Sequence, residues 1–224
     1  MSLEVRNLTK QFAGIKALNN CTLKVKEGSI TSLIGPNGAG KTTLFNIITG
    51  FESPTSGSII FKGSNITKLP AFKRAQLGIS RNFQQVRLFR NLSIKDNLLL
   101  AGAGTYNLEE LHLKIPLSRL SSELSYGQQR LVEIARSYLK PYSLLMLDEP
   151  TSGVNPVVRR ELRRILLRLK KNHQTVFFIE HDMDFVMDVS DHVIVLNEGS
   201  VLAQGTPNKI RNDKRVLTAY LGGR

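Results

Sequence analysis

The sequence feature that most constrains the fold is a glycine-rich loop, residues 35–42, with the sequence GPNGAGKT. It follows an apolar run, residues 30–34, and precedes a segment of helical character, residues 42–49, that stops at Gly50. The pattern G-x-x-x-x-G-K-[ST] between a strand and a helix is typical of a phosphate-binding loop. Its backbone N–H groups and the positive end of the helix dipole bind polyphosphate. The loop therefore predicts a nucleoside triphosphate site.

Two residues of the loop have predicted roles, and two acids further along the chain complement them. Lys41 is expected to reach the β- and γ-phosphates, and Thr42 to offer its hydroxyl to Mg²⁺. A second apolar run, residues 143–147, ends in Asp148 and Glu149. Ligands bind at the carboxyl ends of strands in open α/β sheets. We therefore expect Asp148 to hold Mg²⁺, directly or through water, and Glu149 to act as general base toward a water molecule.

Strand-like and helix-like segments alternate along most of the chain. The predicted strands are residues 3–8, 18–25, 30–34, 58–62, 143–147, 175–179, 193–196 and 200–204. The predicted helices are residues 69–77, 93–103, 126–139, 157–171 and 183–189, with a helical tail over 207–221. Ser93 and Asp182 are expected to cap two of these helices. The alternation predicts an α/β fold whose sheet is mainly parallel and covered on both faces.

Composition limits the class of protein. The 224 residues fit one large domain, or a core with an inserted subdomain. No run approaches 18 apolar residues, so no membrane span is predicted, and the first ten residues lack the apolar stretch of a secretory signal. The single cysteine, Cys21, excludes an internal disulfide and agrees with a reducing cytosol.

The chain is strongly basic, with 31 Lys+Arg against 18 Asp+Glu, a net charge of +13. This balance raises the possibility of a nucleic-acid or anionic-membrane partner. The densest basic run is residues 159–171. Its apolar residues recur at offsets 0, 3, 4 and 7 (Leu162, Ile165, Leu166, Leu169), which marks a buried helical face. A solvated opposite face is therefore favoured over a nucleic-acid patch, because no aromatic residues are interleaved to stack bases.

Six motifs, in this order, resemble those of the ATP-binding cassette (ABC) ATPases over nearly the whole chain. They are a Walker A loop (35–42), a Q-loop with Gln84, a signature motif (124–128, LSYGQ), a Walker B strand (144–148), a D-loop (151–155) and a switch histidine, His181. The resemblance implies that Glu149 is the catalytic glutamate and that Phe12 lies against adenine. It also implies that Gln84 contacts Mg²⁺ or the attacking water, and that His181 contacts the γ-phosphate.

The resemblance also implies an architecture and a complete site. The fold is a P-loop NTPase core with a mainly parallel sheet, an N-terminal antiparallel β subdomain and an inserted helical subdomain. One cassette fills residues 1–224, with a core of 1–84 and 140–224 and a helical subdomain of about 85–139. The cofactors are ATP and Mg²⁺. The nucleotide contacts are Phe12, Gly35, Pro36, Asn37, Gly38, Ala39, Gly40, Lys41, Thr42 and Thr43, with Ser125, Gly127 and Gln128 from the signature. The catalytic residues are Lys41, Gln84, Glu149 and His181, and the metal ligands are Thr42, Gln84 and Asp148.

In such proteins two cassettes pair head to tail, so the signature residues act on the nucleotide of the partner. The expected partners are a second cassette, identical or paralogous, membrane permease subunits and an extracytoplasmic solute-binding protein, at the cytoplasmic face of the membrane. Tyr126 and Asn155 depart from the general family, which has glycine and aspartate there. Both fit the ATPases of branched-chain amino acid importers, as do phrases such as ISRNFQ and EPTSGVNP. Import of branched-chain amino acids or a similar small polar solute is therefore the expected function.

Two alternatives stay open at this point. An ABC ATPase acting on nucleic acid or ribosomes would use the positive charge, but such proteins generally carry a long coiled coil or two cassettes, and this sequence has neither. A nucleotide kinase or GTPase would use the same loop. However, no Asn-Lys-x-Asp motif for reading guanine occurs, and the signature residues would have no role.

Overall fold

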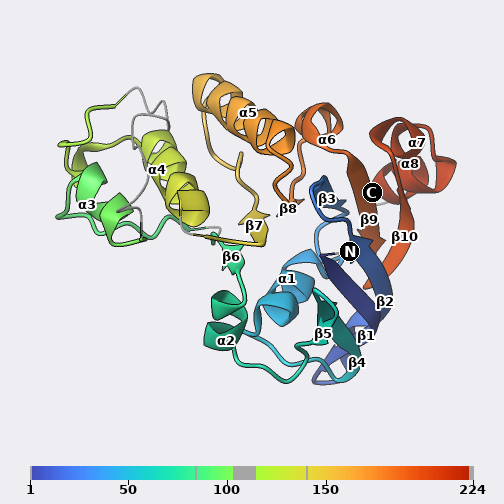
Figure 1. Ribbon diagram of the computed structural model, residues 1–224. Helices are drawn as coiled ribbons and strands as arrows, with labels where there is room; N and C mark the ends of the chain where they lie inside the picture. Colours follow the sequence, from blue (N-terminus) through green and yellow to red (C-terminus); the bar gives the residue numbers. More distant parts are fainter. Residues whose placement is uncertain (1, 84, 103–114, 140, 222–224) are drawn as a thin grey trace.

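The computed structural model describes residues 2–83, 85–102, 115–139 and 141–221, and Gln84 therefore lies outside the described residues. Two β-sheets and the helices around them make up the fold (Figure 1). The smaller sheet is antiparallel, with strand order β2-β1-β4-β5. Its strands are β1 (Leu3–Phe12), β2 (Ile15–Val25), β4 (Ser56–Phe61) and β5 (Ser64–Asn65). The expected antiparallel β region at the N-terminus is thus present.

The larger sheet has the order β10-β9-β3-β8-β7-β6, and all its neighbouring pairs except β9–β10 are parallel. Its strands are β3 (Ile30–Ile34), β6 (Ile79–Arg81), β7 (Leu144–Asp148), β8 (Val176–Ile179), β9 (His192–Asn197) and β10 (Ser200–Gly205). Every residue of β3, β7 and β8 is buried, as expected for parallel strands covered on both faces. The glycine-rich loop follows β3, Asp148 is the last residue of β7 with Glu149 next to it, and His181 follows β8. They therefore lie at one edge of the sheet.

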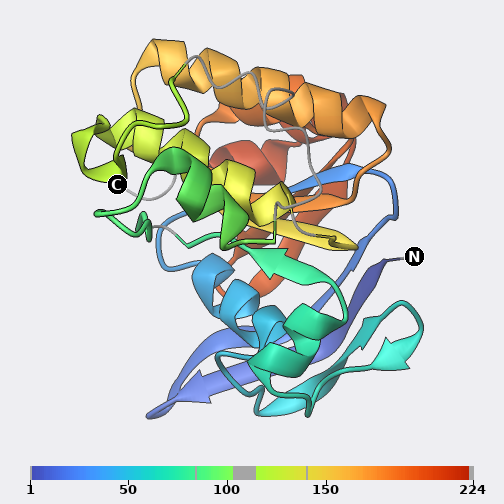
Figure 2. The same ribbon diagram turned by 60° about the vertical axis from the view of Figure 1, so that its left-hand side comes forward.

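Helices cover both faces of the larger sheet. On one face, α1 (Lys41–Thr49) lies between the two sheets, as Figures 1 and 2 show. Its buried apolar residues pack with β1, β2 and β4 on one side and with β7 and β8 on the other. On the opposite face, α5 (Pro156–Lys171), α6 (Met183–Val189) and α7 (Pro207–Arg211) share a second core with the strands, to which α8 (Lys214–Leu221) adds Val216. Both cores include residues of β3, the strand that precedes the glycine-rich loop. Packing on both faces of this strand therefore holds the loop in place.

A third apolar cluster lies apart from the two sheets, at the left of Figure 1. It joins α3 (Ile94–Leu99), the residues around the 3-10 helix Ser121–Glu123, and α4 (Tyr126–Leu139). Helix α4 also sends Leu131 and Ile134 into the core under α5. A separate cluster supports the predicted helical subdomain of about 85–139, although the division of the chain at these boundaries stays a prediction.

Several helix boundaries differ from the sequence prediction. Helix α2 (Ala71–Gln76) begins after Pro70 and stops before Gly78, whose φ is +97°. Helix α3 ends at Leu99, and the predicted tail breaks into α7 and α8. Strand β6 is three residues long and was not predicted, because so short a segment shows no alternation. Both predicted caps are confirmed, since Ser93 accepts a hydrogen bond from Asp96 N and Asp182 from Phe185 N.

Candidate nucleotide site

The glycine-rich loop is held between two other strands by close backbone contacts. A Cβ atom added at Gly35 would lie 2.1 Å from the carbonyl oxygen of Leu196, on β9. One added at Gly40 would lie 2.4 Å from that of Ala17, on β2. Real Cβ atoms do not approach backbone oxygen so closely, and the φ of Gly40 is +97°. Both positions therefore require glycine, and the β1–β2 hairpin lies against the loop.

Lys41 folds back over the loop from the first turn of α1. Its Nζ donates to the carbonyl oxygens of Gly35 at 2.7 Å and Pro36 at 2.8 Å, and the residue is 6% exposed. Burial lowers the pKa of the ammonium, and the charges of Glu149 and Asp148 oppose that effect. The two acids therefore lie within electrostatic range of the ammonium, so the loop and the end of β7 belong to one site.

The residues fit a phosphate group and Mg²⁺. No side chain caps α1, because its N-cap is Gly40, so no side-chain acceptor competes for the N–H groups of its first turn. The Thr42 side chain is exposed, and its hydroxyl and the Asp148 carboxylate are the hard oxygen donors that Mg²⁺ prefers. Among the described residues no group of three or more His, Cys, Asp or Glu side chains could hold a metal ion. Mg²⁺ commonly uses one or two protein carboxylates together with substrate phosphates, which agrees with that finding.

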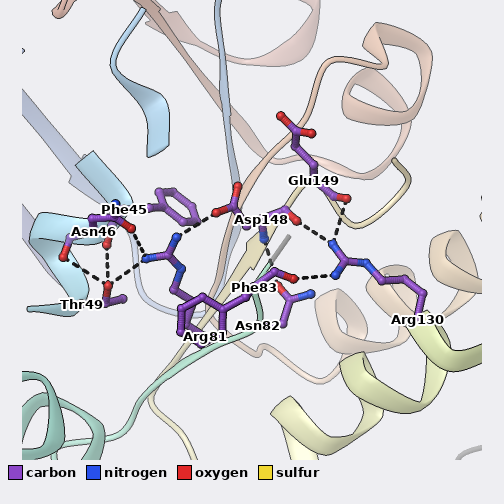
Figure 3. Close-up of polar contacts among 9 residues, drawn as sticks. All are labelled: Phe45, Asn46, Thr49, Arg81, Asn82, Phe83, Arg130, Asp148 and Glu149. Atoms are coloured by element: carbon purple, nitrogen blue, oxygen red, sulfur yellow. Dashed lines mark hydrogen bonds and ion pairs between the residues drawn. The ribbon is translucent and has the colours of Figure 1, made fainter. Parts of the chain in front are cut away.

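Asp148 is paired with an arginine that sequence reasoning missed. Arg81 Nη2 lies 2.8 Å from Asp148 Oδ2, and both side chains are 6% exposed (Figure 3). The second nitrogen, Nη1, donates to Asn46 Oδ1 at 2.8 Å and Thr49 Oγ1 at 3.0 Å, both on α1. Burial lowers the pKa of Arg81, and Asp148 opposes this shift. The end of β7 is thus tied to α1 through one guanidinium.

A second buried arginine, Arg130 on α4, supports the backbone of the same strand end. Its guanidinium donates to the carbonyl oxygens of Asp148 at 2.6 Å, Glu149 at 3.0 Å and Phe83 at 2.6 Å (Figure 3). It also pairs with Glu133 at 2.9 Å, one turn further along α4. Arg130 is fully buried. The sequence did contain a signal: counted from Gly127, Arg130 lies at offset 3 in the pattern 0, 3, 4 and 7 that Leu131 and Ile134 complete on the buried face of α4.

Glu149 and His181 meet at the carboxyl ends of β7 and β8. Glu149 Oε1 lies 2.8 Å from His181 Nε2, and Glu149 has a φ of +46°. The next residue after β8, Glu180, is buried and accepts hydrogen bonds from Thr151 and from His181 N. Burial raises the pKa of Glu180. One buried carboxylate therefore joins the 151–155 segment to the turn that carries His181.

The signature residues lie at the start of α4. Ser125 N donates to Gln128 Oε1 at 3.0 Å, and Gln128 N to Ser125 Oγ at 3.4 Å, a reciprocal cap of the helix. A Cβ added at Gly127 would lie 2.8 Å from Val158 Cγ2 on α5. The Tyr126 ring lies beside Gly153, and a Cβ there would meet it at 3.3 Å. Across the described residues, none of these contacts involves Lys41 or Asp148.

The remaining predicted residues have varied surroundings. Asn155 caps α5 by accepting from Val157 N and Val158 N, both at 3.0 Å, so this departure from aspartate has a local structural use. Phe12 is 43% exposed at the end of β1, with Lys10 Nζ 4.6 Å from its ring centroid. It is not a core residue, and its side chain is available for contact. Gln84 lies outside the described residues, so its role stays a prediction.

The basic side chains of α5 are largely committed to acids. Arg159 pairs with Asp182 at 2.6 Å, Lys170 with Asp191 at 2.8 Å, and Arg163 with Asp188. Arg164 pairs with Glu161 within the helix. A row of paired side chains presents less net positive charge than the sequence run suggests, which weakens the case for a nucleic-acid patch.

Comparison with known proteins gives the family. A family model described as ABC transporter matches residues 18–152. The chain belongs to the ABC transporter family. A second model, described as branched-chain amino acid ATP-binding cassette transporter, matches residues 200–224. Within the described part of this cassette, no helix combines the length and the apolar character that crossing a membrane requires.

Curated relatives of this cassette cover nearly its full length. It is 43% identical to the high-affinity branched-chain amino acid transport ATP-binding protein BraF of Pseudomonas aeruginosa, over 98% of this chain and 97% of that protein. It is 41% identical to LivG of Escherichia coli, which bears the same description, with the same coverage. The lipopolysaccharide export system ATP-binding protein LptB of Escherichia coli is 32% identical, over 99% and 97%.

Solved structures give the same fold. The ADP conformation of the ATP-binding cassette MJ1267 matches with a TM-score of 0.89 at 30% identity, covering 99% of this chain and 98% of that one. A dimeric post-hydrolysis state of the cassette MJ0796, bound to ADP and Pi, matches with a TM-score of 0.78 at 26% identity, covering 92% and 98%. The expected α/β P-loop NTPase fold is confirmed, and none of these relatives favours the nucleic-acid alternative.

Proposed function

We propose that this cassette hydrolyses ATP and thereby powers import of branched-chain amino acids, or a similar small polar solute, through membrane permease subunits. The observation that best supports ATP hydrolysis is the contact between Glu149 Oε1 and His181 Nε2 at 2.8 Å, next to the buried Asp148. Attack of water on a phosphate needs a general base, a group that orients this base and an oxygen donor for a metal ion.

Each residue of the site has a proposed role in ATP hydrolysis. Lys41 and the first turn of α1 bind the phosphates, and Phe12 contacts the adenine. Thr42 and Asp148 hold Mg²⁺, with Gln84 as the further predicted ligand. When bound, Mg²⁺ supplies charge neutralisation at the phosphate oxygens. Glu149 takes the proton of the attacking water, and His181 orients Glu149 and stabilises charge at the γ-phosphate.

A head-to-tail dimer completes the site with Ser125, Gly127 and Gln128 from the second cassette. The MJ0796 cassette bound to ADP and Pi is dimeric, which supports this assembly for a related protein. Ser125, just before α4, is exposed and Gln128 is half-buried. In the described part of the chain their side chains bond to each other's backbone and not to the glycine-rich loop, which agrees with action on a partner. An isologous dimer would contain two such sites.

The cargo and the membrane partners are inferred from the relatives. The names of BraF and LivG, and the match over residues 200–224, support an importer of branched-chain amino acids. LptB, an export protein, is less similar at 32% identity. The cassette would bind permease subunits at the cytoplasmic face of the membrane and work with an extracytoplasmic solute-binding protein. Tagged protein purified from native membranes should bring the permeases with it, and their absence would contradict this assignment.

The Glu149→Gln variant tests the shared site. Removing the general base while keeping the side-chain size should stop turnover and leave an ATP-bound dimer. Size-exclusion chromatography with MgATP should therefore show a dimer for this variant and not for Glu149→Gln combined with Lys41→Ala. Glu27→Gln serves as the control, because Glu27 is exposed at the opposite end of the sheet, ahead of β3. A monomeric profile of Glu149→Gln with MgATP would count against the shared site.

A further inference from the structure

The contact between Arg81 and Asp148 is the feature of the site that the family motifs leave unexplained. Both partners are buried, each with 6% of its side chain exposed. A buried carboxylate without a partner would bind a proton or distort the structure. Arg81 supplies the countercharge for this carboxylate in the folded chain.

Arg81 engages only one side of the carboxylate. Its Nη2 bonds to Asp148 Oδ2, and the backbone N–H of Asp148 is fixed separately by Asn82 Oδ1 at 2.9 Å. Among the residues that the structure describes, no hydrogen bond to the second carboxylate oxygen, Oδ1, is found, so this oxygen can face another ligand. A guanidinium that holds one oxygen of a metal-binding carboxylate orients the other oxygen.

The position of Arg81 is itself fixed by α1. Nη1 bonds to Asn46 Oδ1 and Thr49 Oγ1, and the rings of Phe45 and Phe83 lie 5.7 Å and 5.1 Å from the guanidinium carbon (Figure 3). The same helix begins with Lys41 and Thr42. Arg81 therefore sets Asp148 relative to the helix that carries Thr42, another predicted metal ligand.

We propose that Arg81 is a positioning residue for Mg²⁺, which holds the Asp148 carboxylate against α1 so that its second oxygen faces the metal ion. This inference rests on the proposed function, in which Thr42 and Asp148 bind Mg²⁺. Lysine could not replace Arg81 fully, because three oxygens from two elements are held by one planar fork.

Mg²⁺ titration of nucleotide-bound protein tests the proposal without turnover. The full chain is saturated with a fluorescent, non-hydrolysable ATP analogue, and the free Mg²⁺ concentration at half-maximal fluorescence change is measured. Loss of a residue that orients a metal ligand typically weakens metal binding about 10–100-fold. Arg81→Met should raise the half-maximal Mg²⁺ concentration by at least about tenfold. Affinity for the analogue in EDTA should change less than about twofold, because Arg81 has no predicted contact with the nucleotide.

Arg74→Met is the matched control. Arg74 is also buried, at 2%, and also bonds to α1, through the carbonyl oxygens of Ile47 and Ile48. None of its described contacts is with Asp148. Its replacement should lower thermal stability without moving the Mg²⁺ midpoint. An equal Mg²⁺ shift in Arg74→Met would overturn the proposal, because the shift would then report general loosening of α1.

Two further variants keep the proposal open to refutation. Arg81→Lys, which keeps the charge, should fold even if Arg81→Met does not, and should give a smaller Mg²⁺ shift in the same direction. In an Asp148→Asn background, replacing Arg81 should produce no additional shift of the Mg²⁺ midpoint.

Two results would overturn the proposal. A lower half-maximal Mg²⁺ concentration in either Arg81 variant would mean that Arg81 competes with the metal ion. An unchanged half-maximal concentration would mean that Arg81 has a purely structural role. If wild-type protein binds the analogue but shows no Mg²⁺ response, the metal assignment within the proposed function is wrong instead.

Discussion

Replacing Arg130 by methionine tests most directly how much its hydrogen bonds to the backbone of Asp148 and Glu149 stabilise the fold. The fully buried guanidinium bonds to three carbonyl oxygens and to Glu133, whose side chain is 7% exposed. Methionine fills much of the space but leaves the buried Glu133 carboxylate without this charged partner. Breaking a buried pair in this way costs about 3–5 kcal/mol. In a chain of this size 1 kcal/mol corresponds to about 2–4 °C, so Tm should fall by about 6–20 °C.

Thermal unfolding followed by circular dichroism measures the effect, with two comparison variants. Arg164→Met removes an exposed arginine that also pairs with a glutamate on its own helix, and its Tm should stay within about 2 °C of wild type. The double variant Arg130→Met/Glu133→Met removes the buried carboxylate together with the arginine, so its Tm should lie above that of Arg130→Met. A drop of less than about 3 °C for Arg130→Met would refute the reasoning, as would a double variant less stable than the single one.

Two further predictions concern the loop and the lone cysteine. Gly40→Ala should lower Tm and weaken ATP binding, because its Cβ would lie 2.4 Å from the carbonyl oxygen of Ala17. Gly63 has a φ of +81° but nothing within 4 Å of an added Cβ. In thermal melts, Gly63→Ala should therefore show only the smaller destabilisation that backbone strain causes. Burial raises the pKa of the Cys21 thiol to about 12. Mass spectrometry should therefore show that iodoacetamide modifies the native protein slowly at pH 8 and the protein in urea rapidly. Rapid modification of the native protein would contradict the burial of Cys21.

Much of the fold was predictable because its signals are local and strongly periodic. The glycine-rich loop has one pattern and one structural setting, and the run before Asp148 is apolar throughout, as a strand buried on both faces must be. Helix α5 was predicted from its apolar spacing, and α4 and α6 have the bounds that the sequence indicated. Each of these elements satisfies its pattern without reference to distant parts of the chain.

The contact of Arg81 with Asp148 was not predictable in the same way. Arginine is usually found at the surface, and nothing near Arg81 in the sequence shows that it meets Asp148, 67 positions away. Strand β6, which carries Arg81, is defined by its pairing with β7 rather than by any pattern of its own. The orientation of Tyr126 was also undetermined, because only the folded chain brings Gly153 beside its ring.

The contacts of Arg130 at the end of β7 are made with main-chain oxygens and not with the side chains of residues 148 and 149. Every amino acid presents the same carbonyl group there. Position 149 can therefore accept a different side chain while the strand end keeps this anchor. A cysteine carrying a spin label at that position would keep the main-chain hydrogen bond from Arg130. In the proposed dimer, the distance between two such labels would then follow the movement of the cassettes, which makes position 149 a practical point for attaching a probe.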